Sequence, residues 1–386
     1  MLRIPIESAP ALAAPAWIDV DLDAIGHNVR AFRALLAPGC ALLAVVKSNA
    51  YGHGMVRVAR TALQHGASEL VVANVHEGAL LREAGIAAPI LVAGPVAPAE
   101  AHFVVQHALV PSLGSIELAQ ALARASRRYL PVHVEVDTGM SRHGVPAADL
   151  ATFVDGVLRR GRLSIAGVFT HFAATSVAEV DAMREQLAAF DAAVAGVRAL
   201  RGVRRHLCNT LGALVLPAAH GDAVRIGGGI YGFDPGAAGP RLRPALALKA
   251  RLVGLREVPA GTGVGYGSAF RCARPSRLGL LPLGYGDGLV RELWNGGEVL
   301  VRAQRAPIVG VVSMNQTVVD VTGAPGAGVG DEVVLLGAQG AEVVRAEERV
   351  GAGGSVYEVT TLLRASLPRR YLGGGAGAGR EASRPL

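Results

Sequence analysis

Aromatic residues are scarce in this chain of 386 residues, where Phe, Trp and Tyr together make up 4%. The net charge of +7 comes in short arginine doublets, such as Arg127-Arg128 and Arg204-Arg205, and not in long basic runs. Single-stranded nucleic acids are held by aromatic stacking platforms along a basic groove, and the sequence offers neither. We therefore expect no nucleic-acid partner, and the positive charge favours small anionic molecules.

Cysteines and long apolar runs are also few. Cys40, Cys208 and Cys272 lie far apart and form no C-x-x-C pair, which argues against a disulfide framework or a zinc ribbon and fits the reducing cytoplasm. No stretch of 18 apolar residues lacks charge or proline, so we expect no membrane span. Residues 1–16 form an apolar N-terminal extension, but prolines interrupt it and we expect no signal peptide.

Between residues 17 and 246, strand-like runs alternate with helical stretches. An amphipathic helix is expected over residues 21–37, because its apolar positions share one face and Pro38-Gly39 end it. The strand-like runs are 41–46, 70–73, 90–93, 108–110, 132–136, 165–170, 206–208 and 223–226. Eight such units of similar size predict an α/β fold, a (β/α)8 TIM-type barrel, with a doubly wound open sheet as the alternative.

Beyond residue 246 the pattern changes to apolar runs that are separated by Gly/Pro turns and have no helical period. The runs are 247–255, 278–283, 297–302, 308–312, 317–321 and 332–336. This pattern predicts a C-terminal all-β domain over residues 247–372. Residues 373–386 are rich in Gly, Ala, Arg and Ser, and we expect a disordered tail there.

Lys47 follows the first apolar run of the predicted barrel and precedes a polar, glycine-containing turn. A lysine in this position can use its amine to form a Schiff base with a carbonyl cofactor, although strand-end lysines are common and an ordinary structural lysine stays open. Barrel enzymes carry their chemistry at the C-terminal ends of strands, where Lys47, His171, Asn209 and residues 225–229 all fall. The segments after the last two strands can present backbone N–H groups to an anion.

A series of short segments, in one fixed order, resembles the signature segments of alanine racemases. They are residues 47–54, 137–142, 169–173, 206–210, 224–232, 264–267, 281–288, 313–316 and 357–358. The resemblance covers nearly the whole chain, from residue 17 to about residue 371. It implies an isomerase that depends on pyridoxal 5'-phosphate (PLP) and is built from a barrel followed by a β domain.

The resemblance implies a mechanism with two bases. Racemisation removes the α-proton from one face and returns a proton to the other, so two acid/base groups must flank the reacting carbon. The resemblance assigns these roles to Lys47 and Tyr266. In the family this tyrosine comes from the partner subunit, which implies a head-to-tail homodimer with composite active sites. The implied substrate is a small amino acid, in the first place L- and D-alanine.

The resemblance also implies how PLP is held. Lys47 would carry the cofactor, and Arg225 would donate a hydrogen bond to the pyridine nitrogen without protonating it, because a guanidinium keeps its proton. His171 would link Tyr266 to Arg225. The remaining residues implied to bind the cofactor are Tyr51, Arg142, Asn209, Thr210, Gly227, Gly228 and Tyr357, and those implied to bind the substrate are Arg142, Tyr285, Met314 and Asn315.

Three positions depart from the family pattern. Glu135 stands where many members have a lysine that becomes carboxylated on nitrogen, Ser313 replaces a common cysteine, and Asn315 replaces a common aspartate. In the family the carboxylated lysine presents an anion to the arginine matched by Arg142. We therefore expect a Glu135–Arg142 contact, direct or through a water molecule.

Other functions remain open at this point. A racemase for serine or for several small amino acids is compatible with the changed substrate loop. A PLP decarboxylase on the same barrel is disfavoured, because decarboxylation needs no second base such as Tyr266. A PLP-carrier protein is also disfavoured, because such proteins end before a β domain, whereas residues 247–371 of this chain are expected to form one. All eleven histidines lie at or before His220, so we expect no imidazole metal site in the second domain.

Overall fold

The computed structural model describes residues 14–374 except residues 238, 295 and 352–353. Most of the N-terminal extension and of the C-terminal tail expected from the sequence lies outside the described residues. The chain divides into two compact units. We name them the barrel unit (Ala24–Ala50 and Gly54–Arg243) and the β unit (Met1–Asp23, Tyr51–His53 and Pro244–Leu386).

The barrel unit contains the eight parallel strands that the sequence predicts, and they form a nearly closed ring. The strands are β2 (Ala41–Val45), β3 (Glu69–Val72), β4 (Ile90–Val92), β5 (Val110–Leu113), β6 (Leu130–Asp137), β8 (Leu163–Phe169), β9 (Arg204–His206) and β10 (Ala223–Ile226). They pair in the order β10-β2-β3-β4-β5-β6-β8-β9, and the two-residue strand β7 (Val145–Pro146) pairs with β6. The N–H groups of Asp222 and Arg225 donate to the carbonyls of Arg205 (2.8 Å) and Cys208 (2.9 Å), which joins β9 to β10. The (β/α)8 prediction is confirmed.

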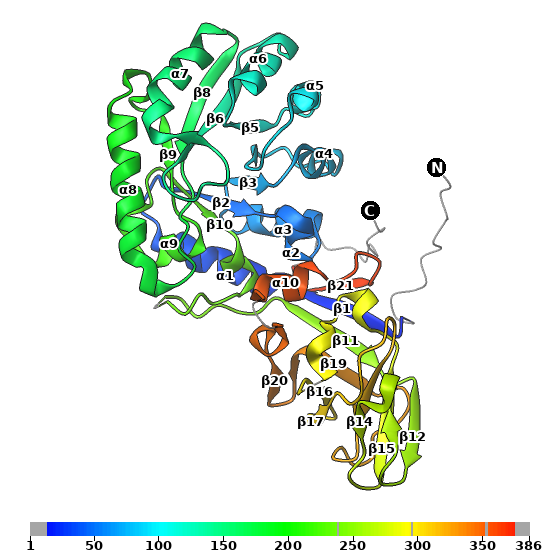
Figure 1. The fold of residues 1–386 in the computed structure, drawn as a ribbon. Helices are drawn as coiled ribbons and strands as arrows, with labels where there is room; N and C mark the ends of the chain where they lie inside the picture. The colour runs from blue at the N-terminus through cyan, green and yellow to red at the C-terminus, as the bar shows by residue number, and fades with distance from the viewer. Residues whose placement is uncertain (1–13, 238, 295, 352–353, 375–386) are drawn as a thin grey trace. The chain divides into compact units, whose positions relative to one another are not determined.

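Helices follow the strands of the barrel unit and lie outside the ring, as Figure 1 shows for α3 to α8. The helices are α1 (Leu22–Leu35), α2 (Lys47–Tyr51), α3 (Met55–Gln64), α4 (Val75–Glu83), α5 (Ala101–Gln106), α6 (Ile116–Ala125), α7 (Leu150–Arg159), α8 (Val180–Ala195) and α9 (Thr210–Val215). In α3, Met55, Val58, Ala59 and Ala62 are buried, at the i, i+3, i+4, i+7 spacing of an amphipathic helix. Full burial of one large aliphatic side chain stabilises such a fold by about 1.5–3 kcal/mol.

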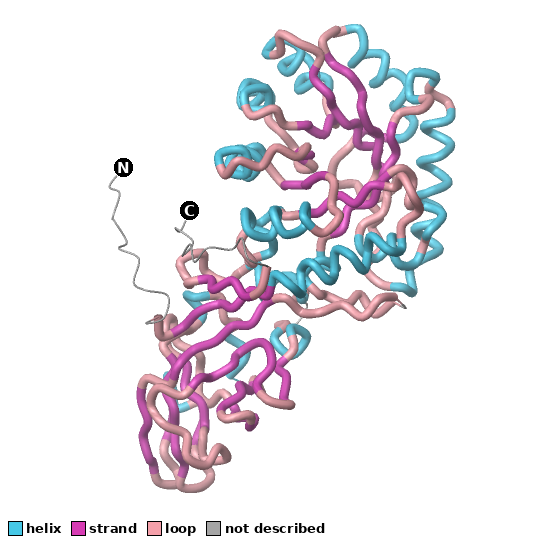
Figure 2. The backbone as a smooth tube through the Cα atoms, turned by 180° about the vertical axis from the view of Figure 1, so that it is seen from behind, coloured by secondary structure: helices cyan, strands magenta, loops and turns pink. Residues whose placement is uncertain are grey.

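Strands and loops make up most of the β unit (Figure 2). The strands are β1 (Ala16–Asp21), β11 (Leu246–Arg251), β12 (Gly254–Val258), β13 (Gly263–Val264), β14 (Phe270–Arg271), β15 (Ser276–Leu281), β16 (Glu298–Val301), β17 (Gln304–Pro307), β18 (Thr317–Asp320), β19 (Glu332–Gln339), β20 (Glu342–Val344) and β21 (Arg369–Leu372). The largest sheet has the order β17-β16-β19-β11-β1-β21, with β20 beside β19, and two small sheets contain β12-β15-β18 and β13-β14. One short helix, α10 (Val356–Thr361), interrupts the predicted all-β pattern.

Short 3₁₀ helices complete both units. In the barrel unit they are η1 (Pro98–Glu100), η2 (Ala147–Asp149), η3 (Val177–Glu179), η4 (Arg198–Leu200), η5 (Pro217–Ala219) and η6 (Gly228–Tyr231). In the β unit they are η7 (Tyr266–Ser268), η8 (Tyr285–Asp287), η9 (Arg291–Trp294) and η10 (Ala346–Arg349).

Strand β1 differs from the prediction, which placed residues 17–23 in the barrel domain. Trp17 and Ile18 pair instead with Lys249 and Leu248 of β11, and Ile18 also aligns with Arg369 of β21. Strand β1 therefore lies between β11 and β21 in this sheet, and its residues Trp17 and Ile18 are buried. The first strand of the chain therefore belongs to the β unit.

Several other predicted strands differ in position, among them the run 206–208, which overlaps β9 only at His206. Two of these differences have a visible local cause. Ala108 has a positive φ of 48° after α5, so β5 begins at Val110, two residues later than predicted. The predicted run 308–312 contributes only an isolated bridge from Ile308 to Val319. In both cases a local backbone turn overrides the apolar pattern.

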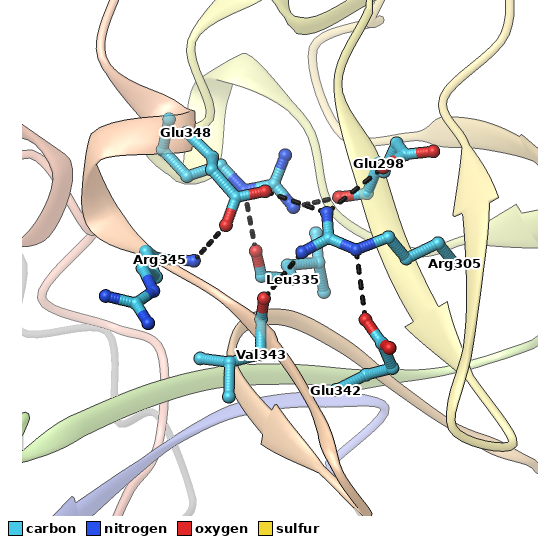
Figure 3. A network of polar contacts seen from close by, with 8 residues as sticks. Glu298, Arg305, Leu335, Glu342, Val343, Arg345 and Glu348 are labelled. Atoms are coloured by element: carbon cyan, nitrogen blue, oxygen red, sulfur yellow. Dashed lines mark hydrogen bonds and ion pairs between the residues drawn. The ribbon is translucent and has the colours of Figure 1, made fainter.

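An exposed charge network ties together several strands of the β unit (Figure 3). Arg305 on β17 contacts carboxylate oxygens of Glu348 (2.8 Å), Glu298 (3.0 Å) and Glu342 (3.1 Å), and donates to the carbonyl of Val343 (2.7 Å). Hydrogen bonds to Glu348, Glu298 and Glu342 raise the pKa of Arg305. Each exposed ion pair contributes little to the free energy of unfolding and is screened by salt. We therefore expect this network to align the strand ends, with only a small effect on the stability of the fold.

The described residues contain no helix that is long and apolar enough to cross a bilayer. The same part of the chain has no group of three or more His, Cys, Asp or Glu side chains placed to hold a metal ion. Cys40, Cys208 and Cys272 are free and buried.

Candidate active site

Lys47 is separated by one residue from the end of strand β2 and lies at the C-terminal end of the barrel strands, where the sequence placed it. Helix α2 begins at this lysine, but Ser48, Asn49, Ala50 and Tyr51 all have left-handed backbone, with φ between 52° and 54°. Left-handed helical conformation costs roughly 1–2 kcal/mol for each residue other than glycine. The chain after Lys47 is therefore strained, and other contacts must hold it in place.

Hydrogen bonds from neighbouring segments hold this left-handed turn. The side chain of Asn49 accepts from the N–H of Met55 (2.8 Å), and its carbonyl accepts from the N–H of Gly54 (2.9 Å). The N–H of Ser48 donates to the carboxylate of Glu77 on α4 (2.5 Å). These contacts fix the direction in which Lys47 leaves the strand.

The surroundings of Lys47 favour the neutral amine. Burial, and then the positive charge of Arg142, lower the pKa of Lys47 below its usual value, while Glu77 opposes them. A neutral amine is the nucleophilic form that attacks a carbonyl group. The lysine is thus chemically suited to the role that the sequence predicts for it.

Arg225, at the end of β10, is buried in the same barrel end. Its guanidinium donates to the carbonyls of His206 (2.6 Å), Thr170 (2.7 Å) and Leu207 (2.9 Å). It also contacts Nδ1 of His206 (2.7 Å) and of His171 (3.5 Å). Burial lowers its pKa to about 10, so Arg225 stays protonated at neutral pH.

The histidines beside Arg225 are neutral, and their tautomers follow from their contacts. A guanidinium can only donate, so Nδ1 of His206 accepts and its Nε2–H donates to Nδ1 of His133 (2.8 Å). By the same reasoning Nδ1 of His171 accepts from Arg225, which leaves the ring proton on Nε2. Burial, and then the charges of Arg225, Arg142 and Lys47, lower the pKa of His171 to about 3.

The sequence predicts a Glu135–Arg142 contact, direct or through a water molecule, and the structure, which describes both residues, shows no direct one. The carboxylate of Glu135, on a side chain that is 8% exposed, accepts a hydrogen bond from Nδ1 of His143 (2.7 Å). Among the described residues no hydrogen bond or ion pair joins Glu135 to Arg142, whose side chain is exposed. His143 follows Arg142 in the sequence, and its imidazole takes the place beside Glu135 that was predicted for the Arg142 guanidinium. A water-bridged Glu135–Arg142 contact stays a prediction.

The loop that carries Arg142 is fixed at its start by Asp137. The carboxylate of Asp137 accepts from the N–H groups of Gly139 (3.0 Å), Met140 (3.0 Å) and Ser141 (3.1 Å). Burial would raise the pKa of Asp137, but these backbone hydrogen bonds lower it below its usual value.

Thr210 joins the two segments in which the sequence predicts an anion site. Its hydroxyl oxygen accepts from the N–H groups of Gly227 and Gly229, at 3.2 Å each. Two donors use both lone pairs of this oxygen, so the hydroxyl hydrogen points elsewhere and can be given to an anion. Asn209 caps α9, because its side chain accepts from the N–H of Gly212 (2.9 Å). The N–H of Gly227, which was predicted to bind the cofactor, donates to Thr210 instead.

Gln186 on α8 is a residue that the sequence did not indicate. Its amide oxygen accepts from the N–H of Ala173 (2.9 Å), and its amide nitrogen donates to the carbonyl of His171 and to the hydroxyl of Thr138 (3.1 Å each). Thr138 is in turn hydrogen bonded to Thr170 (2.7 Å). This buried side chain holds the segment that carries His171.

The β unit contains the remaining predicted residues. The rings of Tyr51 and Tyr357 meet edge to face, with centroids 5.7 Å apart. Burial, and then the neighbouring Tyr357, raise the pKa of the Tyr51 phenol, so it remains a hydrogen-bond donor at neutral pH. These two hydroxyl-bearing side chains, which the resemblance implies bind the cofactor, are therefore neighbours.

Tyr266, Tyr285 and Met314 are exposed on the β unit, by 73%, 42% and 56%. The segments that carry Tyr285 and Met314 are joined, since the N–H of Tyr285 donates to the carbonyl of Ser313 (3.1 Å). The amide of Asn315 donates to the carboxylate of Asp287 at 3.5 Å. Three of the predicted substrate residues, Tyr285, Met314 and Asn315, thus lie on adjoining loops of the β unit, whereas Arg142 belongs to the barrel unit.

Together, the barrel and the groups at its strand ends define a (β/α)8-barrel enzyme in which a buried lysine amine, with Arg142 and Glu77 as its charged neighbours, can react with a carbonyl compound.

The comparison with known proteins identifies the family. Residues 20–235 match the family model described as the alanine racemase N-terminal domain, and residues 245–371 match that of the C-terminal domain. The chain belongs to the alanine racemase family. An alanine racemase from Desulfovibrio desulfuricans is 41% identical over 367 residues, which cover 93% of this chain and 98% of the relative.

Solved structures agree with this assignment. The crystal structure of an alanine racemase from Bacillus anthracis with bound L-Ala-P is 31% identical, with a TM-score of 0.88 over 95% of this chain and 97% of that chain. An alanine racemase from Bartonella henselae with covalently bound pyridoxal phosphate is 29% identical, with a TM-score of 0.84 over 93% of this chain and all of that chain.

Proposed function

We propose that this protein is a PLP-dependent racemase that interconverts L- and D-alanine. The observation that carries the proposal is Lys47 at a barrel strand end, where burial and Arg142 lower the pKa of its amine, in a chain of the alanine racemase family. The substrate assignment follows from the alanine racemases to which the chain is similar.

The residues present fit PLP. The chain has two lysines, and Lys249 is engaged by Asp19 (3.2 Å) and Glu332 (3.1 Å), which leaves Lys47 for a carbonyl group. The hydroxyl hydrogen of Thr210 is available to an anionic oxygen. The Bartonella henselae relative with covalently bound pyridoxal phosphate supports the same cofactor. Bound PLP would supply an electron sink that makes the α-proton of an amino acid acidic.

Within this proposal each residue of the chain has a definite task. Lys47 binds the cofactor and holds or releases a proton on one face of the substrate. Tyr266 does the same on the other face, and Arg142 and the hydroxyls of Tyr51, Thr210 and Tyr357 orient the bound groups. We infer that Gly228, Asn209 and the loops with Tyr285, Met314 and Asn315 complete the site.

Arg225 determines the electronic character of the site. Because its guanidinium can only donate, it orients the pyridine nitrogen without protonating it. It also has a neutral partner in His171, whose Nε2–H is available to a further acceptor. We propose that this acceptor is the Tyr266 oxygen, which would then share a proton with the imidazole.

We propose that the protein acts as a head-to-tail homodimer. Tyr266 is 73% exposed on the β unit, an unusual setting for a base that has to work away from water. Exposed Tyr285 and Met314 lie in adjoining loops, and aromatic residues and methionine are enriched where protein surfaces meet. A second copy of the chain would bury them. Three free cysteines are compatible with a cytoplasmic location.

The test is a racemisation assay on a panel of L-amino acids, followed by chiral chromatography. L-Alanine should give D-alanine; comparable rates with L-serine would mean a broader racemase, which the change to Asn315 leaves open. Borohydride treatment should fix PLP to Lys47. Peptide mapping then identifies the modified lysine, and the peptide that contains Lys249 is the internal control. Reduced cofactor on Lys249, or no product from any amino acid, would contradict the proposal.

A further inference from the structure

Glu77 connects two strand ends of the barrel unit. It lies in the first turn of α4, on the segment that follows β3, and one carboxylate oxygen accepts from the N–H of Ala73 (2.8 Å). The other oxygen accepts from the N–H of Ser48 (2.5 Å), which belongs to the segment after β2. One side chain therefore bridges the residue next to Lys47 and the start of a neighbouring helix.

Helix capping explains only half of this arrangement. Asn74 caps α4 by accepting from the N–H of Glu77 (2.9 Å), and the reach of Glu77 back to Ala73 resembles the reciprocal bond of a capping box. The contact with Ser48 contributes nothing to the end of α4. It satisfies a backbone donor of the left-handed turn instead.

The turn needs such a contact because its conformation is unfavourable. Ser48, Asn49, Ala50 and Tyr51 are left-handed without a glycine among them, and strain of this kind persists only where surrounding contacts impose it. Ser48 is the first of these residues. The charge-assisted hydrogen bond from the Ser48 N–H to Glu77 therefore holds the backbone at the point where the chain turns away from the strand.

We propose that Glu77 is a positioning residue for Lys47, which holds the strained turn after the lysine through the Ser48 N–H and faces the amine with a negative charge. The inference rests on the proposed function, since it concerns the lysine that would carry PLP. It assigns Glu77 no contact with substrate or cofactor.

The electrostatics of the barrel end agree with this role. The charged and titratable groups that act together with Lys47 are Arg142, Glu77 and His171, and His171 is neutral. Burial and Arg142 lower the pKa of Lys47, and Glu77 alone raises it. Loss of the Glu77 charge should therefore lower this pKa further and release the amine from its proton at a lower pH.

The experiment compares four variants of the full chain. Glu77→Gln removes the charge and leaves one of the two N–H donors facing an amide NH₂. Glu77→Asp keeps the charge on a side chain too short to bridge Ala73 and Ser48. Asn74→Ala removes the helix cap alone, and Glu83→Gln makes the same charge change at the far, exposed end of α4.

Two measurements separate positioning from general stability. Hydrogen–deuterium exchange of peptides over residues 46–54, read by mass spectrometry, needs no cofactor. Exchange should become about 10-fold faster or more in both Glu77 variants, because a hydrogen bond to a charged group contributes enough for such a factor. The rate of PLP uptake by the cofactor-depleted chain is then measured against pH. Its acidic midpoint should move to lower pH in Glu77→Gln and stay in Glu77→Asp.

The outcomes are distinguishable. Unchanged exchange in both Glu77 variants, equal acceleration in Asn74→Ala or Glu83→Gln, or an unshifted midpoint in Glu77→Gln would overturn the inference. Absence of PLP uptake by the unaltered chain would overturn the proposed function, and with it any role toward Lys47 in catalysis. The exchange result would still decide whether Glu77 holds the turn.

Discussion

The pair formed by Glu135 and His143 gives a quantitative prediction for the barrel unit. The side chains are 8% and 22% exposed, and their atoms are 2.7 Å apart. Removing one partner of a fully buried charged pair costs about 3–5 kcal/mol, and a hydrogen bond to a charged group contributes about 1.5–3 kcal/mol. Because His143 retains some contact with water, we expect a coupling free energy near the lower range, about 1.5–3 kcal/mol.

A double-mutant cycle measures this coupling. The variants are Glu135→Gln, His143→Gln and the combination, and urea unfolding is followed by circular dichroism at the helical band. A second cycle with Glu135→Gln and Arg142→Gln is the control, because these two side chains make no direct contact in the structure. Its coupling should be smaller than that of the first cycle, because a direct hydrogen bond joins only Glu135 and His143. A larger coupling for Arg142 than for His143 would refute the assignment of Glu135 to His143.

Further predictions concern the chemistry of the site. In Arg142→Gln the loss of a positive charge should raise the pKa of Lys47, so the acidic midpoint of PLP uptake should move to higher pH; an unchanged or lower midpoint would contradict the electrostatic account. Mixing the inactive variants Lys47→Ala and Tyr266→Phe should restore about a quarter of the activity per chain, because random exchange in a two-fold dimer makes half of the dimers hybrids with one intact site of two. No recovery despite proven subunit exchange would mean that each site is built from one chain. Activity should be indifferent to bicarbonate, since Glu135 supplies its anion without carbon dioxide.

The sequence was sufficient to predict the barrel, because each strand–helix unit is encoded by local patterns. Alternating apolar runs and turn residues mark the strands within a few residues, and their C-terminal ends place Lys47, His171 and Arg225. The partners of strand β1 could not be predicted, for a physical reason. Its partners β11 and β21 lie more than two hundred residues away, and no local pattern records which distant strand a segment will join.

The supporting contacts of the site could not be predicted in the same way. The left-handed turn after Lys47 contains no glycine at residues 48–51, so the usual signal for positive φ is missing. Asn74 and Glu77 show the spacing of a capping box, which would have indicated the helix start but not the contact with Ser48. The bonds of Gln186 and His143 depend on tertiary packing, and neither residue stands in a motif.

The most direct test of the central claim, that Lys47 and Tyr266 act on opposite faces of the substrate, is deuterium exchange in the variant Tyr266→Phe. Racemisation should fall by at least ~10²-fold, the low end of general acid–base effects. The variant should still exchange the α-proton of D-alanine for deuterium, followed by NMR in heavy water, because Lys47 serves that face, whereas exchange from L-alanine should be lost. Equal loss of exchange from both isomers would contradict the two-base account.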